Sequence, residues 1–216
     1  MKIRYFGHAC FEIQGGDVTV YTDPYYGIGY ELPSGLQADV VTISHNHYDH
    51  NYRGAFAGTP KFHESTEKSV YKGMSIEGLK TYHDEKKGAL RGENTVFTFS
   101  ADGVSVCHLG DLGEADNGEV CEFAGGVDVL CIPVGGNYTI DAAAAKAYVL
   151  KIRPQIVIPM HFSMSGGTID IDGVESFLKL FSKEEAEILR EKTLNLSACE
   201  RNGSVKIVVM EKEERI

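Results

Sequence analysis

The sequence predicts one α/β domain over residues 1–216, built from two β-rich halves with helices on the outside. Short apolar or alternating runs, separated by Gly, Pro and Asp, fill the first half, and helical patterns join the strands of the second half. Hydrophobic residues make up 43% and charged residues 24% of the chain, which is ordinary globular usage and excludes a disordered or fibrous protein. A chain of this length buries about 70% of its unfolded surface, so its folding requires neither disulfides nor a metal.

The first half is expected to form a series of short strands. Gly15-Gly16-Asp17 separates two such runs in the pattern of a β-hairpin, and Asp23-Pro24 ends the second run. A β-branched run at 39–44 indicates a buried strand, because a strand covered on both faces needs apolar side chains on both. Together the patterns predict strands at residues 3–5, 10–13, 18–21, 39–44, 95–99, 104–109 and 127–134.

Helical patterns begin after residue 140. Asp141 is a favourable N-cap for an alanine-rich helix over 142–152, and Pro154 prevents the helix from continuing. A strand at 156–160 follows, and two Glu-rich stretches at 172–181 and 183–193 are interpreted as surface helices. A last strand is expected at 205–210, before a charged tail at 211–216.

The charge and the chain ends exclude several classes of function. The chain has 21 Lys and Arg against 31 Asp and Glu, a formal net charge of -10, which disfavours extended nucleic-acid binding. No apolar stretch has the length of a signal peptide or of a membrane span. The five cysteines lack Cys-x-x-Cys spacing, as expected of reduced thiols in the core. We therefore expect a cytoplasmic protein without a membrane partner.

A cluster of metal-binding residue types follows the predicted buried strand at 39–44. His45, His47, Asp49 and His50 supply three imidazoles and a carboxylate within six residues. On extended backbone His45 and His47 point the same way, and a turn after His47 brings Asp49 and His50 toward a second point nearby. One loop can therefore serve two metal centres. Imidazole and carboxylate ligands suit Zn²⁺, and also Mn, Fe or Ni.

Two further candidate ligands also stand directly after apolar strands. Asp111 lies in Leu109-Gly110-Asp111-Leu112-Gly113, where the flanking glycines allow a close approach to two cations. His161 follows the strand at 156–160. Alone, each would be interpreted as an ordinary turn or packing residue. Because the histidine-rich loop at 45–50 is present, we interpret both Asp111 and His161 as candidate ligands.

These residues resemble the metallo-β-lactamase superfamily of metal-dependent hydrolases, whose hallmark is the motif in the loop at 45–50. Gly7-His8, Asp23-Pro24, Gly110-Asp111 and Pro159-Met160-His161 extend the resemblance over most of the chain. Within the superfamily, the chain is similar to the compact branch of hydrolases related to ascorbate-6-phosphate lactonase. The resemblance implies a four-layer αββα sandwich, with two mixed β-sheets and the metals at one edge between them.

The resemblance also implies how the ligands divide between two divalent cations. Each cation would be held by residues from the loop and from a distant segment, with one carboxylate shared. The implied division is His45 and His47 on the first cation, Asp49, His50 and His161 on the second, and Asp111 bridging both.

The first cation needs one more histidine, located between the loop and Asp111. Both His63 and His83 qualify by position. We favour His83 as the ligand, because it follows a short strand pattern and precedes a Gly-rich loop. His63 is expected at the surface.

Further polar residues match positions that surround the metals in the family. Asp23 corresponds to an early Asp that supports the loop by hydrogen bonding and does not itself bind metal. His8 and Asn94 are expected beside the site, next to the ligands or the substrate, and Arg91 near the substrate. His108 is expected to end its strand and to support the neighbouring turn.

The ligand set and the resemblance together predict a hydrolase. Two cations about 3.5–4 Å apart lower the pKa of a shared water to about 7, so a hydroxide bound to both metals attacks the substrate. Asp49 and Asp111 are the expected catalytic residues, and Asp49 would return a proton to the leaving group. The expected substrate is a small ester, lactone or phosphodiester.

Two other functions stay open from the sequence. One is phosphodiesterase or nuclease activity on nucleotides, and the other is a non-catalytic metal-binding or redox protein. Zn²⁺ is the first expectation for both cations, with Mn, Fe or Ni as alternatives. The oligomeric state is also open, a homo-oligomer included.

Overall fold

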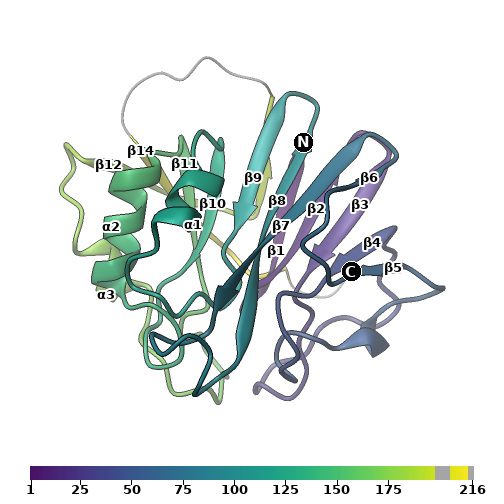
Figure 1. Cartoon of the computed structure of the whole chain (residues 1–216), viewed down its shortest axis with the longest axis horizontal. Helices are drawn as coiled ribbons and strands as arrows, with labels where there is room; N and C mark the ends of the chain where they lie inside the picture. Colours follow the sequence, from purple (N-terminus) through teal and green to yellow (C-terminus); the bar gives the residue numbers. More distant parts are fainter. Residues whose placement is uncertain (198–204, 214–216) are drawn as a thin grey trace.

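Two β-sheets face each other across the core of the protein, whose computed structural model describes residues 1–197 and 205–213 (Figure 1). The sheets have six and eight strands. One hydrophobic cluster takes side chains from both sheets, among them Phe11 and Val20 from the first and Phe99 and Val106 from the second. The predicted fold class, an α/β sandwich with two mixed sheets, is confirmed.

The six-stranded sheet combines antiparallel and parallel pairs in the order β13-β1-β2-β3-β4-β5. β1, β2 and β3 pair antiparallel, and the turn at 15–17 places Gly15 opposite Val18, which confirms the predicted hairpin. β3, β4 and β5 run parallel to one another. The strands are β1 (Lys2–Gly7), β2 (Cys10–Gly15), β3 (Val18–Thr22), β4 (Val40–Thr42), β5 (Lys61–His63) and β13 (Thr193–Asn195).

The eight-stranded sheet has the order β12-β14-β11-β10-β9-β8-β7-β6. β6 to β9 are antiparallel, whereas β9, β10, β11, β14 and β12 are parallel neighbours. Parallel strands end at the same edge of a sheet, where α/β proteins form their sites. The strands are β6 (Ser69–Tyr71), β7 (Met74–Tyr82), β8 (Glu93–Ala101), β9 (Val104–His108), β10 (Val129–Pro133), β11 (Ile156–Met160), β12 (Ala186–Glu191) and β14 (Val205–Met210).

Three helices lie together on one side of the strands: α1 (Gly118–Phe123), α2 (Ala142–Ile152) and α3 (Glu175–Leu178) (Figure 1). The predicted helix at 142–152 is confirmed by α2. Asp141 caps it by accepting the Ala144 N–H at 2.8 Å, and it ends where Arg153 adopts a φ of 54°. Tyr148 and Val149 of α2 are buried in the main core.

The outer face of the six-stranded sheet is covered by the segment 24–56 and not by an α-helix. This segment includes the 3-10 helix η1 (Arg53–Ala55). Tyr25, Ile28 and Leu36 are buried there against Phe6 and Val41 of the sheet, in a second hydrophobic cluster. β4, which belongs to the sheet, and the loop at 45–50 both lie within this stretch of chain, so the buried residues before β4 help to hold the loop that carries the histidine motif.

The predicted helix at 183–193 is wrong. Residues 186–191 form β12, which pairs in parallel with β14 from Ala186 opposite Val205 to Glu191 opposite Met210. Residues 193–195 form β13, which pairs with β1 in the other sheet. The exposed Glu, Lys and Arg side chains of this segment favour a helix only weakly, and sheet pairing outweighs that preference.

The predicted helix at 172–181 is much shorter in the structure. Only α3 is an α-helix, and the helix does not begin at Asp172 because this residue is held by the neighbouring loops. Its N–H donates to the Gly135 carbonyl oxygen, and its carbonyl oxygen accepts from the Ser163 N–H, each at 2.8 Å. The sequence did not indicate β5, β6 or α1, and indicated β7 only as a short pattern before His83.

Two predictions extend past the described residues. Cys10, Cys107 and Cys131 are free and buried and Cys121 is free and partly buried, whereas Cys199 lies outside the described residues. The charged tail is described only to residue 213. In the described part of the chain, every helix is too short or too polar to cross a bilayer.

Candidate metal centre

The predicted ligand residues meet at one edge of the sandwich, just beyond the ends of four strands. The loop at 45–50 follows β4, His83 follows β7, Asp111 follows β9, and His161 follows β11. Backbone hydrogen bonds fix two of these positions. The His83 N–H donates to the Gly92 carbonyl oxygen at 3.0 Å, and the His161 N–H donates to that of His8 at 2.8 Å.

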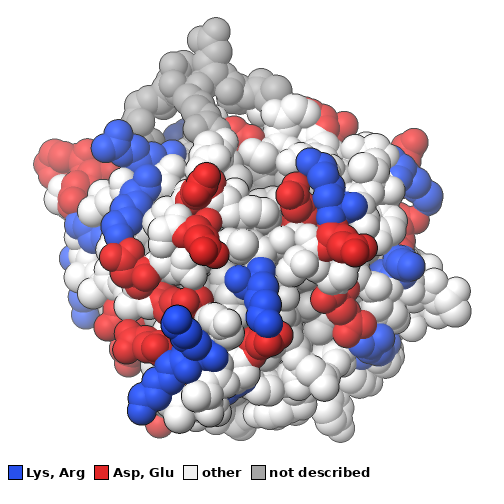
Figure 2. Space-filling model, in the orientation of Figure 1, with Lys and Arg blue, Asp and Glu red and all other residues white. Residues whose placement is uncertain are grey.

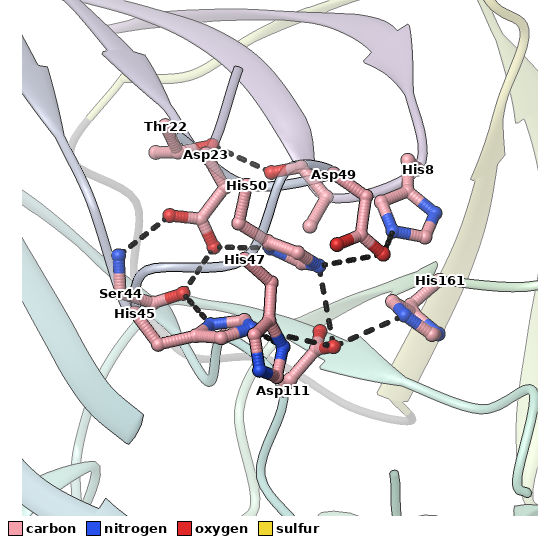
Figure 3. A network of polar contacts seen from close by, with 12 residues as sticks. His8, Thr22, Asp23, Ser44, His45, His47, Asp49, His50, Asp111 and His161 are labelled. Atoms are coloured by element: carbon pink, nitrogen blue, oxygen red, sulfur yellow. Dashed lines mark hydrogen bonds and ion pairs between the residues drawn. The ribbon is translucent and has the colours of Figure 1, made fainter. Parts of the chain in front are cut away.

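Asp111 lies at the centre of this group, between His50 and His161 (Figure 3). Four imidazoles approach one of its oxygens. The distances from Asp111 Oδ2 to the ring Nε2 atoms are 3.1 Å for His161, 3.2 Å for His50, 3.2 Å for His83 and 4.0 Å for His45. Asp111 is only 2% exposed, so the rings surround its carboxylate away from bulk water.

The donor atoms form three groups. All donor atoms of one group lie within 4.8 Å of one another. The first two groups are separate, and the third joins them through Asp111. Their members are His45, His47 and His83; His8, Asp49, His50 and His161; and His45, His50 and Asp111. This arrangement has the division that the resemblance implies, with His8 added to the second group.

Asp23 and Ser44 orient two of the rings. Asp23 accepts the Ser44 N–H at Oδ1 (2.7 Å) and the Ser44 hydroxyl at Oδ2 (2.6 Å), and His50 Nδ1 lies 3.0 Å from the same Oδ2 (Figure 3). The Ser44 Oγ is also 2.9 Å from His45 Nδ1. Because that hydroxyl donates to Asp23, it accepts from His45 Nδ1, which leaves His45 Nε2 as the acceptor of the ring. The sequence had not singled out Ser44.

Asn94 and His108 hold the turn that carries Asp111. The Asn94 amide accepts the Asp111 N–H at 2.9 Å and donates to the Leu109 carbonyl oxygen at 3.0 Å. His108 Nε2 donates to the Ala9 carbonyl oxygen at 2.9 Å, while its Nδ1 accepts the Gly110 N–H at 3.1 Å. Asn94 is fully buried. Its side chain therefore supports Asp111 and does not reach a substrate.

His8 lies directly against the second group of donors. Its Nε2 is 3.3 Å from Asp49 Oδ2, and its ring centroid is 4.2 Å from that of His161 (Figure 3). Its backbone has a φ of 55°, which is uncommon for a residue with a side chain. The Tyr5 hydroxyl and the His161 N–H both donate to its carbonyl oxygen, at 2.9 and 2.8 Å, and fix this conformation.

Burial and charge shift the pKa values of the group in opposite directions. Burial lowers the pKa of His45 well below its usual range and that of His8 to about 4. Burial alone would raise the pKa of Asp111, but the facing rings of His161 and His50 outweigh it and hold that pKa well below its usual range. Burial likewise lowers the pKa of His50, but Asp111 outweighs burial and raises it. The centre therefore stabilises an anionic carboxylate at Asp111.

The expectation that His63 lies at the surface is wrong. His63 is 4% exposed, its Nδ1 is 3.1 Å from the Tyr71 hydroxyl oxygen, and its ring packs on Phe97 with centroids 5.7 Å apart. It ends β5, opposite Thr42 of β4. Its side chain belongs to none of the donor groups in the described part of the chain, whereas His83 belongs to the first.

The donor groups open into a cavity of about 470 Å³. Residues from five loops line it. They are His47, Tyr48, Asp49, His83, Arg91, Asp111, Tyr138, His161, Thr168, Ile169 and Asp170.

Comparisons with known proteins point to one family. A family model described as a β-lactamase superfamily domain matches residues 2–161, which include every member of the donor groups. A crystal structure from Thermotoga maritima, described as a proposed Zn-dependent hydrolase of the metallo-β-lactamase superfamily, is 35% identical. Its TM-score is 0.78, and the match covers 97% of each chain. The chain belongs to the metallo-β-lactamase superfamily.

Two other similar proteins are more distant. A UPF0173 metal-dependent hydrolase from Methanospirillum hungatei is 29% identical over 189 residues, covering 76% of this chain and 83% of the relative. An isothiocyanate hydrolase from Delia radicum gut bacteria has a TM-score of 0.64 at 12% identity, covering 83% of this chain and 91% of that one, and shares the fold alone. The narrower resemblance to ascorbate-6-phosphate lactonase stays a prediction.

Proposed function

We propose that this chain is a metal-dependent hydrolase that holds two divalent cations, Zn²⁺ in the first instance, and cleaves a small ester, lactone or phosphodiester. The observation that carries the proposal is the approach of four imidazole Nε2 atoms to within 4.0 Å of Asp111 Oδ2. One carboxylate oxygen cannot satisfy four rings, whereas cations between the rings and the carboxylate would. The relatives described as metal-dependent hydrolases support the same function.

The residues present fit such cations. Asp111 Oδ1 is buried without a hydrogen-bond partner in the described part of the chain, and His50 Nε2 faces Asp111 Oδ2 at 3.2 Å without hydrogen-bond geometry. A buried polar atom left unpaired costs about 1–3 kcal/mol, so both atoms favour a ligand. Nitrogen and oxygen donors without a thiolate suit Zn²⁺, and also Mn, Fe or Ni.

The donor groups suggest which residues hold which cation. We assign the three-histidine group to the first cation and the group containing Asp49, apart from His8, to the second, with Asp111 on both. The assignment is His45, His47 and His83 for the first cation, and Asp49, His50 and His161 for the second.

Two such cations supply, when bound, a hydroxide nucleophile near neutral pH and polarise the scissile carbonyl or phosphoryl group. The chain's own residues orient the ligands and move the proton. Asp23 fixes the His50 ring through Nδ1 at 3.0 Å. Asp49 lines the cavity and is 15% exposed, so its carboxylate is placed to pass a proton to the leaving group. His8 fixes the position of that carboxylate at 3.3 Å.

The size of the cavity and the surface charge favour a small-molecule substrate. A volume of about 470 Å³ lies within the range of small-molecule sites. On the face shown in Figure 2, Lys and Arg side chains are interspersed with Asp and Glu, without a continuous basic track for a long polyanion. The net charge of -10 acts in the same direction.

Metal content and hydrolysis, measured together, test the proposal. The purified protein is supplied with Zn, Mn, Fe or Ni, assayed by elemental analysis, and incubated with aryl esters, lactones and bis(4-nitrophenyl) phosphate. We expect close to two cations per chain and turnover of at least one substrate class. Activity on the phosphodiester alone would select the phosphodiesterase alternative.

Variants of the centre complete the test. Asp49→Asn and His50→Ala should abolish turnover, while Asp17→Asn, in the exposed hairpin turn at 15–17, should leave it unchanged. A protein that takes up none of the four metals contradicts the cation sites. Turnover that survives both Asp49→Asn and His50→Ala contradicts the hydrolase mechanism, and two bound cations without turnover support the non-catalytic alternative.

A further inference from the structure

A half-buried arginine, Arg91, lies on the wall of the cavity that contains the metal centre. Arg91 is the only Lys or Arg among the described residues that line this cavity. Its guanidinium forms no ion pair within the described part of the chain. Its contacts are the Asn137 carbonyl oxygen, 3.3 Å from Nη2, and the Tyr138 ring, whose centroid is 5.4 Å from Cζ.

The backbone under Arg91 is held in place without using its guanidinium. Asp84, which is buried, accepts four main-chain N–H groups within the loop between β7 and β8. The donors are Lys86 at 2.8 Å, Gly88 at 3.1 Å, Leu90 at 3.0 Å and Arg91 at 2.8 Å. A guanidinium has five N–H donors, and that of Arg91 has one protein acceptor in the described chain. Most of its donors are therefore available to a ligand.

Arg91 also stands between the metal cavity and additional space. A second hollow of about 320 Å³ shares His83, Arg91 and Tyr138 with the first. A substrate whose scissile bond lies at the metal centre would therefore pass Arg91 if it extends into the second hollow. Asp170 lines the first cavity as well, but it is exposed and forms no ion pair with Arg91 among the described residues. Arg91 thus forms no ion pair with a carboxylate of the described residues, although Asp84, Glu85 and Asp141 line the second hollow.

We infer that the substrate carries a carboxylate or phosphate group in addition to the bond that is cleaved, and that Arg91 binds this group. This assignment rests on the proposed function. A guanidinium can donate two parallel N–H bonds to a carboxylate or phosphate, which gives specificity as well as attraction. The Tyr138 ring beside the guanidinium restricts its orientation, so the donors are arranged before the substrate arrives.

Pairs of probes that differ only in the anionic group test the inference. The first pair is 4-nitrophenyl butyrate and 4-nitrophenyl hemiglutarate, and 4-nitrophenyl 4-phosphonobutanoate replaces the carboxylate by a phosphonate. We expect the metal-loaded protein to prefer an anionic ester, and Arg91→Gln to lower the anionic-to-neutral ratio of kcat/KM by about 10- to 100-fold, mainly through KM. Arg91→Lys should restore part of the preference, and Arg190→Gln, at an exposed site on β12, should leave the ratio unchanged.

Binding of the matching anilides separates this inference from the proposed function. Glutaranilic acid and butyranilide have the same skeletons, and their Kd values are measured by calorimetry on the metal-loaded protein and on Arg91→Gln. A Kd for glutaranilic acid that rises about 10- to 100-fold in the variant, relative to butyranilide, supports the inference even if no ester is hydrolysed. An Arg91→Gln protein that keeps the wild-type ratio within about twofold overturns it, because charged hydrogen bonds contribute more than that.

Discussion

A single methyl group at Gly113 should disturb the proposed first cation site without changing any ligand side chain. Gly113 lies two residues after Asp111, and its N–H donates to the Tyr82 carbonyl oxygen at 2.9 Å. The turn after β9 therefore contacts the end of β7, immediately before His83. Gly113→Ala adds a Cβ at this contact.

The structure gives the size of the disturbance. A Cβ at Gly113 would lie 2.3 Å from the His83 carbonyl carbon and 2.4 Å from the Asp84 nitrogen, whereas ordinary contacts begin at 3.4 Å. The two backbones must then separate by about 1 Å, several times the roughly 0.2 Å that metal–ligand distances tolerate. Displacement of this size costs on the order of 100-fold in a preorganised site, and the crowding itself about 1–3 kcal/mol of stability.

Zinc content at a buffered free Zn²⁺ concentration measures the effect. We expect Gly113→Ala to lose the first cation, and Gly135→Ala to lose the second, because a Cβ at Gly135 would lie 2.3 Å from the His161 carbonyl oxygen. Gly118→Ala is the matched control, since a Cβ there meets nothing within 4 Å. Urea unfolding of the metal-free proteins shows that each variant folds. A folded Gly113→Ala protein with wild-type zinc content and affinity would refute this account of the site.

Three other substitutions test the supporting residues. Because burial lowers the pKa of His8 to about 4, the unfolded chain takes up a proton there that the folded chain does not. His8 should therefore cost the metal-free protein about 3 kcal/mol of stability as the pH falls from about 6.5 to about 4. His8→Gln should lose correspondingly less stability than the wild type in urea unfolding, and equal losses would contradict this. Asp111→Asn removes the charge that four imidazoles face. Zinc content should therefore fall below one cation per chain, and turnover should decrease by at least about 100-fold. Retention of both cations would be inconsistent with a bridging Asp111. Asn94→Ala leaves the buried Asp111 N–H and Leu109 carbonyl oxygen without their partner. The free energy of unfolding should therefore decrease by about 2–4 kcal/mol. A decrease under about 0.5 kcal/mol would argue against a supporting role of Asn94.

Sequence patterns predicted the elements whose signals are local. The helix at 142–152 and the strands at 156–160 and 205–210 match α2, β11 and β14 residue for residue. Asp141 and Pro154 mark the ends of α2, and apolar runs at 156–160 and 207–210 mark the two strands. Each signal depends only on neighbouring residues, so the rest of the fold is not needed to interpret it.

The predictions failed where pairing with a distant segment decides the structure. Residues 183–193 have helix-forming side chains, yet Ala186 to Glu191 form a strand because β14 offers an unpaired edge. Asp172 is likewise held by the Gly135 carbonyl oxygen, so the helix predicted at 172–181 does not begin there. In both cases a hydrogen-bonded partner far along the chain outweighs a weak local preference.

The same distinction holds for the candidate site. The sequence by itself determined which residue types are available, because three histidines and an aspartate in the loop at 45–50 are a local signal for metal binding. It favoured His83 over His63 as a ligand but misplaced His63 at the surface, and only the tertiary structure shows where the two side chains lie. β5 carries His63 to Tyr71 and Phe97, whereas β7 carries His83 to 3.2 Å from Asp111. The place of Arg91 on the cavity wall was decided in the same way, because contacts between distant residues depend on how the two sheets pair and pack.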